Sequence, residues 1–492
     1  MIVHLSVLQV IIPLMAAPAC LLLRKRELVW AFATLATFVT FAVSVLLLSQ
    51  VMQSGAISYD MGGWEAPWGI EYRIDMLNAP LLVLISGISA IALLAARTSI
   101  ENEIPENRHS FFYIAWLLCM AGLLGITATG DAFNVFVFLE ISSLATYTLI
   151  ALGKDRRALW ASFQYLVAGT IGATFILIGI GLMYVMTGTL NMADLAQRLP
   201  EVENTKTVFT AFAFFIVGVC MKLALFPLHL WLPNAYAFAP SIVTTFLAAT
   251  ATKVAVYVMI RFIFDVFGFE FSFTHFPLQE ILMTLGIAGI FVASIVAINQ
   301  DNLKRMLAYS SVAQIGYLIL GISFASQTGI MATLLHMLNH GLMKGALFLA
   351  MAAVVYRMGV ANLSQMHGIA SRMPLTMAAF LIGGLSLIGV PLTVGFVSKW
   401  YLVSAALENG WWPVAAAILL GSLLSVIYIW RVIEVAYFKS VSNNTPDVKE
   451  APASILIPMW ILVLANLYFG MDTSLTVSVT QMAAADLFGG LL

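Results

Sequence analysis

The sequence predicts an all-α protein that crosses a membrane about fourteen times, and three observations support this fold class. Of the 492 residues, 61% are hydrophobic and only 10% are charged, whereas soluble domains carry about 25% charged residues. The mean hydropathy is +0.97. Apolar runs of about 20 residues, the length that crosses the hydrocarbon core as a helix, recur along the whole chain.

The apolar runs define fourteen expected spans joined by short connections. The first run lacks a small-residue cleavage site, so we interpret it as a span and not as a signal peptide. Pro227 and Pro391 are expected to break the seventh and twelfth spans, because proline removes a helical hydrogen bond and clashes with the preceding turn. The expected spans are 5–23, 28–51, 76–96, 110–129, 132–151, 160–187, 208–230, 241–264, 279–299, 304–323, 328–356, 375–403, 411–438 and 453–471.

Basic residues in the connections predict the orientation of the chain, because Lys and Arg are enriched in cytoplasmic loops. The basic stretches 24–26, 154–157 and 304–305, and the loop flanked by Arg357 and Arg372, fall on one side when every span is counted. The acidic stretch 60–75 falls on the other side. We therefore expect a multi-pass protein of the cell (inner) membrane, with both termini on the non-cytoplasmic side.

Charge and cysteine content exclude several function classes. The net charge is −1, which argues against a nucleic-acid partner. The three cysteines stand singly inside apolar runs, which argues against an iron–sulfur or structural zinc site. We expect no cofactor and no metal, and the lipid bilayer is the first expected partner.

Spans 4–8 and 9–13 form a weak internal repeat. Lys222 and Lys399 are 177 residues apart in the fourth member of each unit, and Lys253 and Arg431 are 178 apart in the fifth. A unit of five spans reverses its orientation when it is repeated, and inverted repeats with broken helices are typical of transporters. The expected parts are N-terminal helices (1–109), a first repeat (110–264), a second repeat (279–438), and a last helix with a short tail (453–492).

Three ionisable residues lie deep inside the first repeat. Glu140, Lys222 and Lys253 are flanked by apolar residues, where a charge costs about 2.5–3.5 kcal/mol. Lys222 is the natural partner of Glu140, because a pair costs less than two lone charges. Desolvation disfavours the charged form of an amine, so a lysine at this depth can exchange a proton. The structural alternatives are a neutral, hydroxyl-capped Glu140 and a Lys253 that binds a backbone carbonyl.

His336, His340 and Lys344 follow one another at every fourth residue of span 11, so they share one helix face. A lone histidine would be an ordinary core residue. Three such groups on one face favour a proton relay, since histidine titrates near pH 6.5. Metal binding by the two histidines is the alternative, but no third ligand lies nearby in the sequence and Lys344 would repel a cation.

Span 12 repeats the combination of a helix break and a lysine. Pro391 frees the carbonyl of Leu387, and Lys399 follows two turns later. The alternative is a lysine that snorkels to the interface. His229, just after the first break, is a possible proton entry point, although it also fits an ordinary loop. Arg431 cannot relay a proton because arginine stays charged, so it is a counter-charge or an interface anchor.

Together these residues predict a proton path at membrane depth. Protons hop between groups that change charge near the working pH, as buried lysine and histidine do. Na⁺ instead prefers oxygen ligands. The lysines therefore indicate that H⁺, more than Na⁺, moves through this chain.

Several stretches resemble the antiporter-like subunits of respiratory complex I, membrane-bound hydrogenases and Mrp-type multisubunit Na⁺/H⁺ antiporters. The motif DAFNVFVFLE resembles the D subunit of Mrp antiporters in particular. The resemblance covers spans 4 to 12. The matching stretches are 131–140, 221–240, 247–257, 300–318 and 334–349.

The resemblance implies a fourteen-helix core with two inverted five-helix units and broken helices 7 and 12. It also implies a role for each titratable residue of the path. The implied roles are a glutamate–lysine pair (Glu140, Lys222), a bridging lysine (Lys253), a connecting relay (His336, His340, Lys344) and a terminal lysine (Lys399).

Our functional hypothesis is a proton-translocating, non-enzymatic subunit of a multisubunit Na⁺/H⁺ antiporter, assembled with other membrane subunits. The first alternative is a proton-pumping subunit of a redox complex. The others are a proton-coupled subunit for inorganic-carbon uptake, with a zinc protein as its partner, and a structural scaffold.

Overall fold

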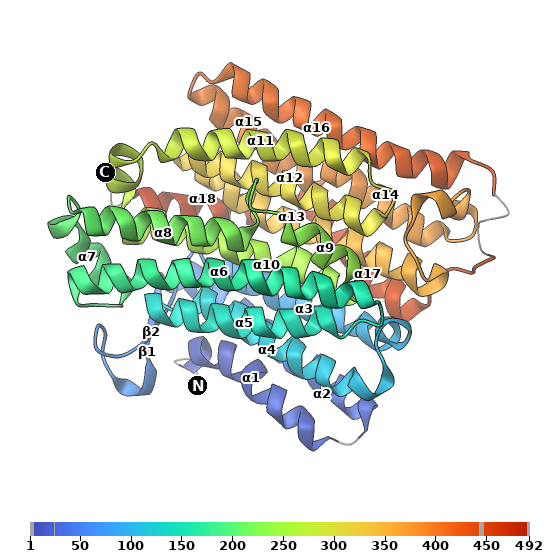
Figure 1. Cartoon of the computed structure of the whole chain (residues 1–492), viewed down its shortest axis with the longest axis horizontal. Coiled ribbons are helices and arrows are strands. Elements are labelled where there is room, and N and C mark those ends of the chain that lie inside the picture. The colour runs from blue at the N-terminus through green and yellow to red at the C-terminus, as the bar shows by residue number, and fades with distance from the viewer. Residues whose placement is uncertain (1–3, 24, 442–446, 490–492) are drawn as a thin grey trace.

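The computed structural model describes residues 4–23, 25–441 and 447–489, which form a bundle of long helices lying side by side (Figure 1). Thirteen of these helices are long and apolar enough to cross a membrane. They are α1 (Leu5–Ala19, extended by the 3₁₀ turn Cys20–Leu22), α2 (Arg26–Ser54), α3 (Ala79–Glu103), α4 (His109–Ala128), α5 (Ala132–Ala151), α6 (Arg156–Thr187), α8 (Lys206–Leu223), α10 (Ser241–Arg261), α11 (Leu278–Ile298), α12 (Leu303–Ser323), α13 (Gln327–Met358), α16 (Trp412–Ile433) and α17 (Ala453–Met471).

Shorter elements complete the chain. The helices are α7 (Met192–Val202), α9 (Trp231–Phe238), α14 (Pro374–Ile388), α15 (Val394–Glu408) and α18 (Ser474–Gly489). The π-helical turns are η5 (Phe262–Val266), η6 (Phe271–His275) and η9 (Glu434–Phe438). The isolated 3₁₀ turns are Met61–Gly63, Glu106–Arg108, Leu363–Gln365 and Ile369–Ser371. Strands β1 (Ile57–Asp60) and β2 (Glu71–Ile74) form an antiparallel hairpin in which Ile57 pairs with Ile74.

The predicted helix breaks are confirmed. Helix α8 ends at Leu223, where Ala224 takes a left-handed conformation with φ of 61°, and the chain resumes as α9. The predicted span 375–403 is divided into α14 and α15, with Gly389 left-handed at φ of 95° between them. The thirteen long helices and this divided pair account for the fourteen predicted spans.

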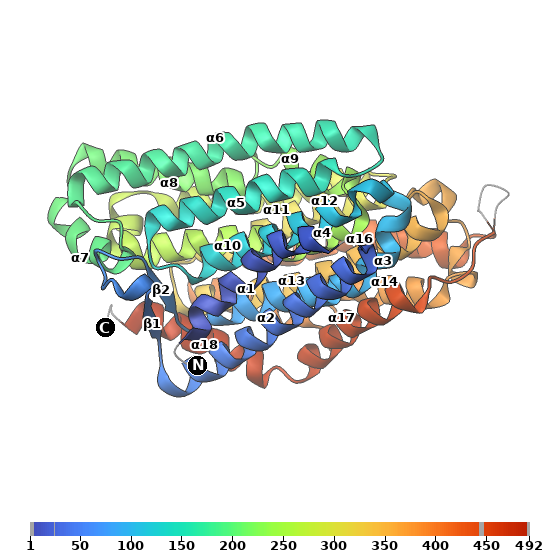
Figure 2. The same ribbon diagram turned by 90° about the horizontal axis from the view of Figure 1, so that it is seen from below.

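Three segments are more ordered than the sequence indicated. The acidic connection after α2 contains the β-hairpin, and the connection after α6 contains helix α7. The expected C-terminal tail is helix α18, which packs against α13. Helices α10, α12 and α13 occupy the middle of the bundle in both views, and their side chains are mostly buried (Figures 1 and 2).

Two matched stretches have the same architecture. Helices α6 and α13 are both 32 residues long, and each ends at a left-handed glycine, Gly188 or Gly359. Isolated β-bridges join Asp131 to Asn191 and Asn302 to Asn362. All these counterparts are 171 residues apart, in contrast to the spacing of 177 between Lys222 and Lys399. Lys222 lies before its helix break, whereas Lys399 lies after its own.

Glycines bring two helix pairs into backbone contact. A Cβ on Gly218 of α8 would lie 2.6 Å from the carbonyl oxygen of Gly172 on α6. A Cβ on Gly316 of α12 would lie 2.6 Å from the carbonyl oxygen of Gly286 on α11. Real Cβ atoms do not approach so closely, so each contact requires glycine.

Candidate functional site

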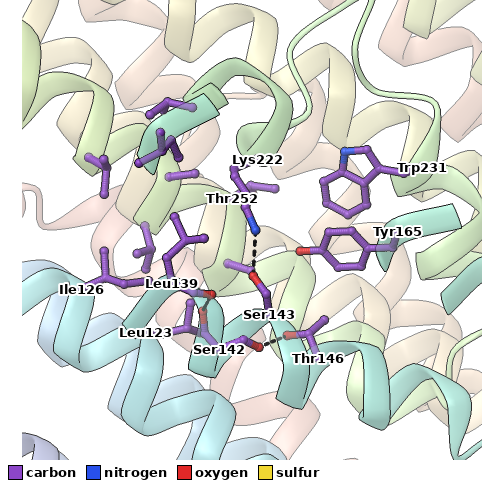
Figure 3. Close-up of a pocket in the computed structure, with 16 residues that line it drawn as sticks. Leu123, Ile126, Leu139, Ser142, Ser143, Thr146, Tyr165, Lys222, Trp231 and Thr252 are labelled. Atoms are coloured by element: carbon purple, nitrogen blue, oxygen red, sulfur yellow. Dashed lines mark hydrogen bonds between the residues drawn. The ribbon is translucent and has the colours of Figure 1, made fainter. Parts of the chain in front are cut away.

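The first helix break positions Lys222 against α5. The Lys222 side chain is 6% exposed, and its Nζ lies 3.7 Å from Oε1 of Glu140. The same Nζ donates a hydrogen bond of 2.9 Å to Oγ of Ser143, one turn along α5 (Figure 3). The structure therefore brings the predicted pair together. Glu140 is only partly covered, at 28% side-chain exposure, so its carboxylate is the less enclosed member of the pair.

A small cavity of about 40 Å³ adjoins Lys222, with Ser143 and Tyr165 among its lining residues (Figure 3). It also touches Thr252, the neighbour of Lys253 on α10, so it extends from the first break toward the centre of the bundle. Glu140 Oε1 and the Tyr147 hydroxyl are buried without a hydrogen-bond partner among the described residues. Buried polar atoms normally have partners, so these two atoms are exceptions to that rule beside Lys222.

His229 and Asn234 flank the first break. His229 is 6% exposed, and its Nδ1 has no partner among the described residues. Its ring centroid lies 5.4 Å from that of Phe226, so the residue is packed inside the protein and is not an ordinary surface-loop histidine. Asn234 Nδ2 donates to Oε1 of Gln164 at 2.9 Å, which joins α9 to α6.

Lys253 lies in the middle of α10 and is fully buried. Its Nζ donates to the carbonyl oxygen of Ala248 at 2.5 Å. No carboxylate within the described part of the chain forms an ion pair with it. The bond to a carbonyl is the structural alternative raised from the sequence, and it leaves the ammonium without a counter-charge.

The three predicted groups on α13 do share one face. The rings of His336 and His340 are parallel to within 8° and their centroids are 5.8 Å apart. Lys344 Nζ donates to the carbonyl oxygen of Leu307 at 2.8 Å and to Oγ of Ser310 at 2.5 Å. Among the residues that the structure describes, no group of three His, Cys, Asp or Glu side chains is placed to hold a metal ion.

At the second helix break, Lys399 is bound by backbone carbonyl groups. Its Nζ donates to the carbonyl oxygens of Leu387 at 3.0 Å and Ile388 at 2.9 Å, and to Oγ of Ser422 at 3.0 Å. The Leu387 carbonyl is the one that Pro391 frees by interrupting the helix. The adjacent Ser398 bonds Nδ1 of His336 at 2.9 Å, which connects this break to α13.

Arg431 stands apart from these residues. Its guanidinium is half-buried and donates to the carbonyl oxygens of Ile298 and Gln300, which tie α16 to the end of α11. This arrangement fits an anchor between helices and involves no titratable group.

Two further polar groups were not predicted from the sequence. Ser241, at the start of α10, donates from both its N–H and its Oγ to Glu103 Oε2 at 2.9 Å. Lys304 Nζ lies 3.3 Å from the same Oγ. Gln314 of α12 is fully buried, and both polar atoms of its amide lack a partner among the described residues. The only sequence signal for these residues is their polarity within, or at the end of, an apolar run.

Comparison with known proteins identifies one family for most of this arrangement. The family described as NADH:quinone oxidoreductase/Mrp antiporter, TM, matches residues 129–425, a range that includes both helix breaks. The N subunit of the NADH-quinone oxidoreductase of Desulforudis audaxviator is 43% identical over 483 residues, covering 95% of this chain and 96% of that protein.

Two other matches extend over nearly the whole chain. The D subunit of the Na(+)/H(+) antiporter of Bacillus subtilis is 29% identical over 482 residues, covering 98% of this chain and 96% of that protein. A chain of the archaeal membrane-bound sulfane sulfur reductase superposes with a TM-score of 0.90 at 32% identity, covering 98% of each chain. These matches confirm the resemblance that the sequence motifs indicated.

Proposed function

The chain belongs to the NADH:quinone oxidoreductase/Mrp antiporter family, and from that premise we propose that it is the proton-translocating subunit of a multisubunit monovalent-cation/proton antiporter. It is a multi-pass membrane protein with the fold of antiporter-like subunits.

The observation that supports the proposal most strongly is the Lys222 ammonium held between a partly exposed carboxylate and a buried hydroxyl. Glu140 at 3.7 Å favours the charged lysine, and enclosure in protein opposes it. If the carboxylate turns toward another charge, Lys222 loses its counter-charge and releases its proton toward α10. The next acceptors along this direction are Lys253, His340, His336 and Lys399.

The chemistry of the path supports H⁺ as the ion that moves through it. Apart from Glu140, its titratable groups are amines and imidazoles, which repel a metal cation when charged and exchange protons readily. Hard cations are held by oxygen ligands, mainly carboxylates and carbonyls. Na⁺ as the exchanged ion is therefore proposed from the similarity to the D subunit of the Bacillus subtilis Na(+)/H(+) antiporter.

A second candidate function is proton pumping within a redox-driven complex. The 43% identity to the N subunit of an NADH-quinone oxidoreductase favours it, because this identity exceeds that to the antiporter protein. The same residues would form the path, and electron transfer in other subunits would drive it. Iron–sulfur subunits that copurify with the chain would favour this candidate.

The proposed function is tested by Glu140→Gln in the intact complex reconstituted into sealed vesicles. We expect cation-driven proton exchange to fall to background while the complex assembles normally, because Lys222 then has no charge to respond to. Glu280→Gln is the matched control, since Glu280 is an exposed acid at the start of α11. Exchange near the wild-type rate in assembled Glu140→Gln vesicles would overturn the proposed path.

A further inference from the structure

A cavity of about 880 Å³ is lined by residues of β2, α7 and α18. These three elements lie toward the same end of the bundle (Figure 2). Four carboxylates and two guanidinium groups are among its lining residues. These are Glu71, Arg73, Asp75, Arg261, Asp265 and Asp486. None of them belongs to the proton path described above, and we call this cavity the vestibule.

Arg261, the last residue of α10, lies at the inner side of the vestibule. It is 8% exposed. Its Nη2 lies 2.8 Å from Asp75, and its Nη1 bonds to Asp265. Its Nε donates to the hydroxyl of Tyr257 at 3.2 Å. The guanidinium is thus held on three sides between the vestibule and the interior of the bundle.

Arg261, Tyr257 and Lys253 occupy successive turns of one face of α10. Side chains on a helix lean toward its N-terminus, so each of these side chains extends toward the next one inward. The Tyr257 hydroxyl accepts from Arg261 and donates to the carbonyl oxygen of Thr127 at 3.1 Å. With both bonds made, this hydroxyl has little capacity left for a water molecule from the vestibule.

We propose that the vestibule is an aqueous access route to Lys253, and that Arg261 is the positioning residue that closes it. Arginine neither gives nor accepts a proton, so its guanidinium blocks proton transfer while it occupies this place. When it leaves Asp75 and Tyr257 and keeps only Asp265, the Tyr257 hydroxyl becomes available to water. The route then reaches the middle of the proposed path directly from one membrane face. This inference rests on the proposed function.

Two features favour an access route over a purely structural ion pair. The pair faces a large polar cavity, whereas a structural pair needs no such space. In addition, burial and the neighbouring Asp75 raise the pKa of Asp486 on α18 above its ordinary value. A carboxyl that holds its proton more tightly at the rim is suited to hand protons to water in the vestibule.

The test measures access to position 253 in the whole complex, in sealed vesicles, with a small membrane-impermeant cationic thiol reagent. Lys253→Cys supplies the target, and Ala485→Cys, on the exposed vestibule wall, identifies the membrane face from which the reagent enters. The three native cysteines of this chain are buried, and the unsubstituted complex serves as the blank for its other subunits. Lys253→Cys is then compared with the double variants that add Arg261→Gln or Asp75→Asn.

We expect slow labelling of Lys253→Cys and at least ~tenfold faster labelling when Arg261→Gln is added, because breaking a buried ion pair shifts the opening equilibrium by more than this factor. Asp75→Asn leaves Arg261 with one carboxylate partner and should increase the labelling rate by a smaller factor. It replaces Arg261→Gln in the test if that variant does not assemble. Unchanged labelling in the assembled double variants, while Ala485→Cys reacts, overturns the inference. Failure of the proposed function would appear separately, as normal exchange in Glu140→Gln.

Discussion

The two helix breaks hold their lysines by different chemistry. Lys222 faces a carboxylate at 3.7 Å, whereas Lys399 donates to two backbone carbonyls and one hydroxyl. A carboxylate can turn away or be neutralised, but carbonyl dipoles are fixed by the backbone. In the proposed path, this difference would make the first break the adjustable end and the second a fixed binding point.

The same contrast recurs at two arginines that lie next to π-helical turns. Arg261 precedes η5 and is held by the carboxylates of Asp75 and Asp265. Arg431 lies just before η9 and is held by carbonyl oxygens. At both kinds of site, the member that comes first in the chain is held by a charge pair, which responds to pH and to other charges, and the later member is held by neutral dipoles.

The largest expected effect comes from replacing each lysine by arginine. Both Lys222→Arg and Lys399→Arg should reduce proton exchange in vesicles to background, because arginine does not release its proton. Their stabilities should differ, since a guanidinium can pair with Glu140 but does not fit three acceptors arranged around one ammonium. The melting temperature of the purified complex should therefore fall only for Lys399→Arg.

The exposed Lys206, on the same helix as Lys222, provides the control variant Lys206→Arg. Exchange retained by Lys222→Arg would show that this lysine does not release a proton. Equal losses of melting temperature for the two variants would contradict the difference between the breaks.

A smaller effect is expected in double-mutant cycles on stability. Glu140→Gln with Lys222→Met should give a coupling energy of about 1–3 kcal/mol, as expected for a largely buried charge pair. Ser422→Ala with Lys399→Met should give about 1 kcal/mol, the size of one hydrogen bond. Thermal unfolding of the complex measures both cycles, and equal coupling energies would remove the distinction between the breaks.

The two arginine sites should also differ in how their local stability responds to low pH. Burial raises the pKa of Asp75, but the adjacent Arg261 outweighs it and holds that pKa below the ordinary value of 3.8. Because the pKa of Asp75 is lowered in the folded protein, its ion pair stabilises the fold fully at a pH above the ordinary carboxyl pKa. This stabilisation is lost as the pH falls through the lower pKa of the folded state.

Amide hydrogen exchange, corrected for its intrinsic pH dependence, tests this expectation. Protection at the end of α10 and in β2 should stay constant from about pH 7 to about pH 4 and then decrease. The end of α16 around Arg431 should show no such step, because its partners do not titrate. A loss of protection near the same pH at both arginine sites would contradict the proposed difference between them.

The smallest effect is expected at Ser143. Ser143→Ala removes one hydrogen bond from Lys222, worth about 1 kcal/mol, but leaves Glu140 in place. Exchange rates in vesicles should fall by several-fold at most. A loss as complete as that expected for Glu140→Gln would mean that the hydroxyl, and not the carboxylate, controls Lys222.

Much of the fold could be predicted because its signals are local. Apolar run lengths indicated the helices, and Pro227 and Pro391 indicated the breaks. The contact between Glu140 and Lys222 followed from the cost of a lone charge in a membrane. The carbonyl bound by Lys399 was also foreseeable, since proline at position 391 frees Leu387.

The remaining site features depend on contacts between distant parts of the chain. Ser241 is 138 residues from Glu103, and Arg261 is 186 residues from Asp75. These residues stand at helix ends, where charged side chains are common and carry no specific signal. The repeat was predicted from its lysines, but the helix ends show a different spacing, because each lysine occupies a different side of its break.

The glycine contacts between helices have a mechanical consequence. Helices α6 and α8 touch through Gly172 and Gly218, and α11 and α12 touch through Gly286 and Gly316. Helices in backbone contact cannot slide past each other without a clash, so we expect each pair to move as one rigid body. We therefore expect the backbone to bend at the unwound joints at 224–230 and 389–393, beside Lys222 and Lys399, and not within these helix pairs.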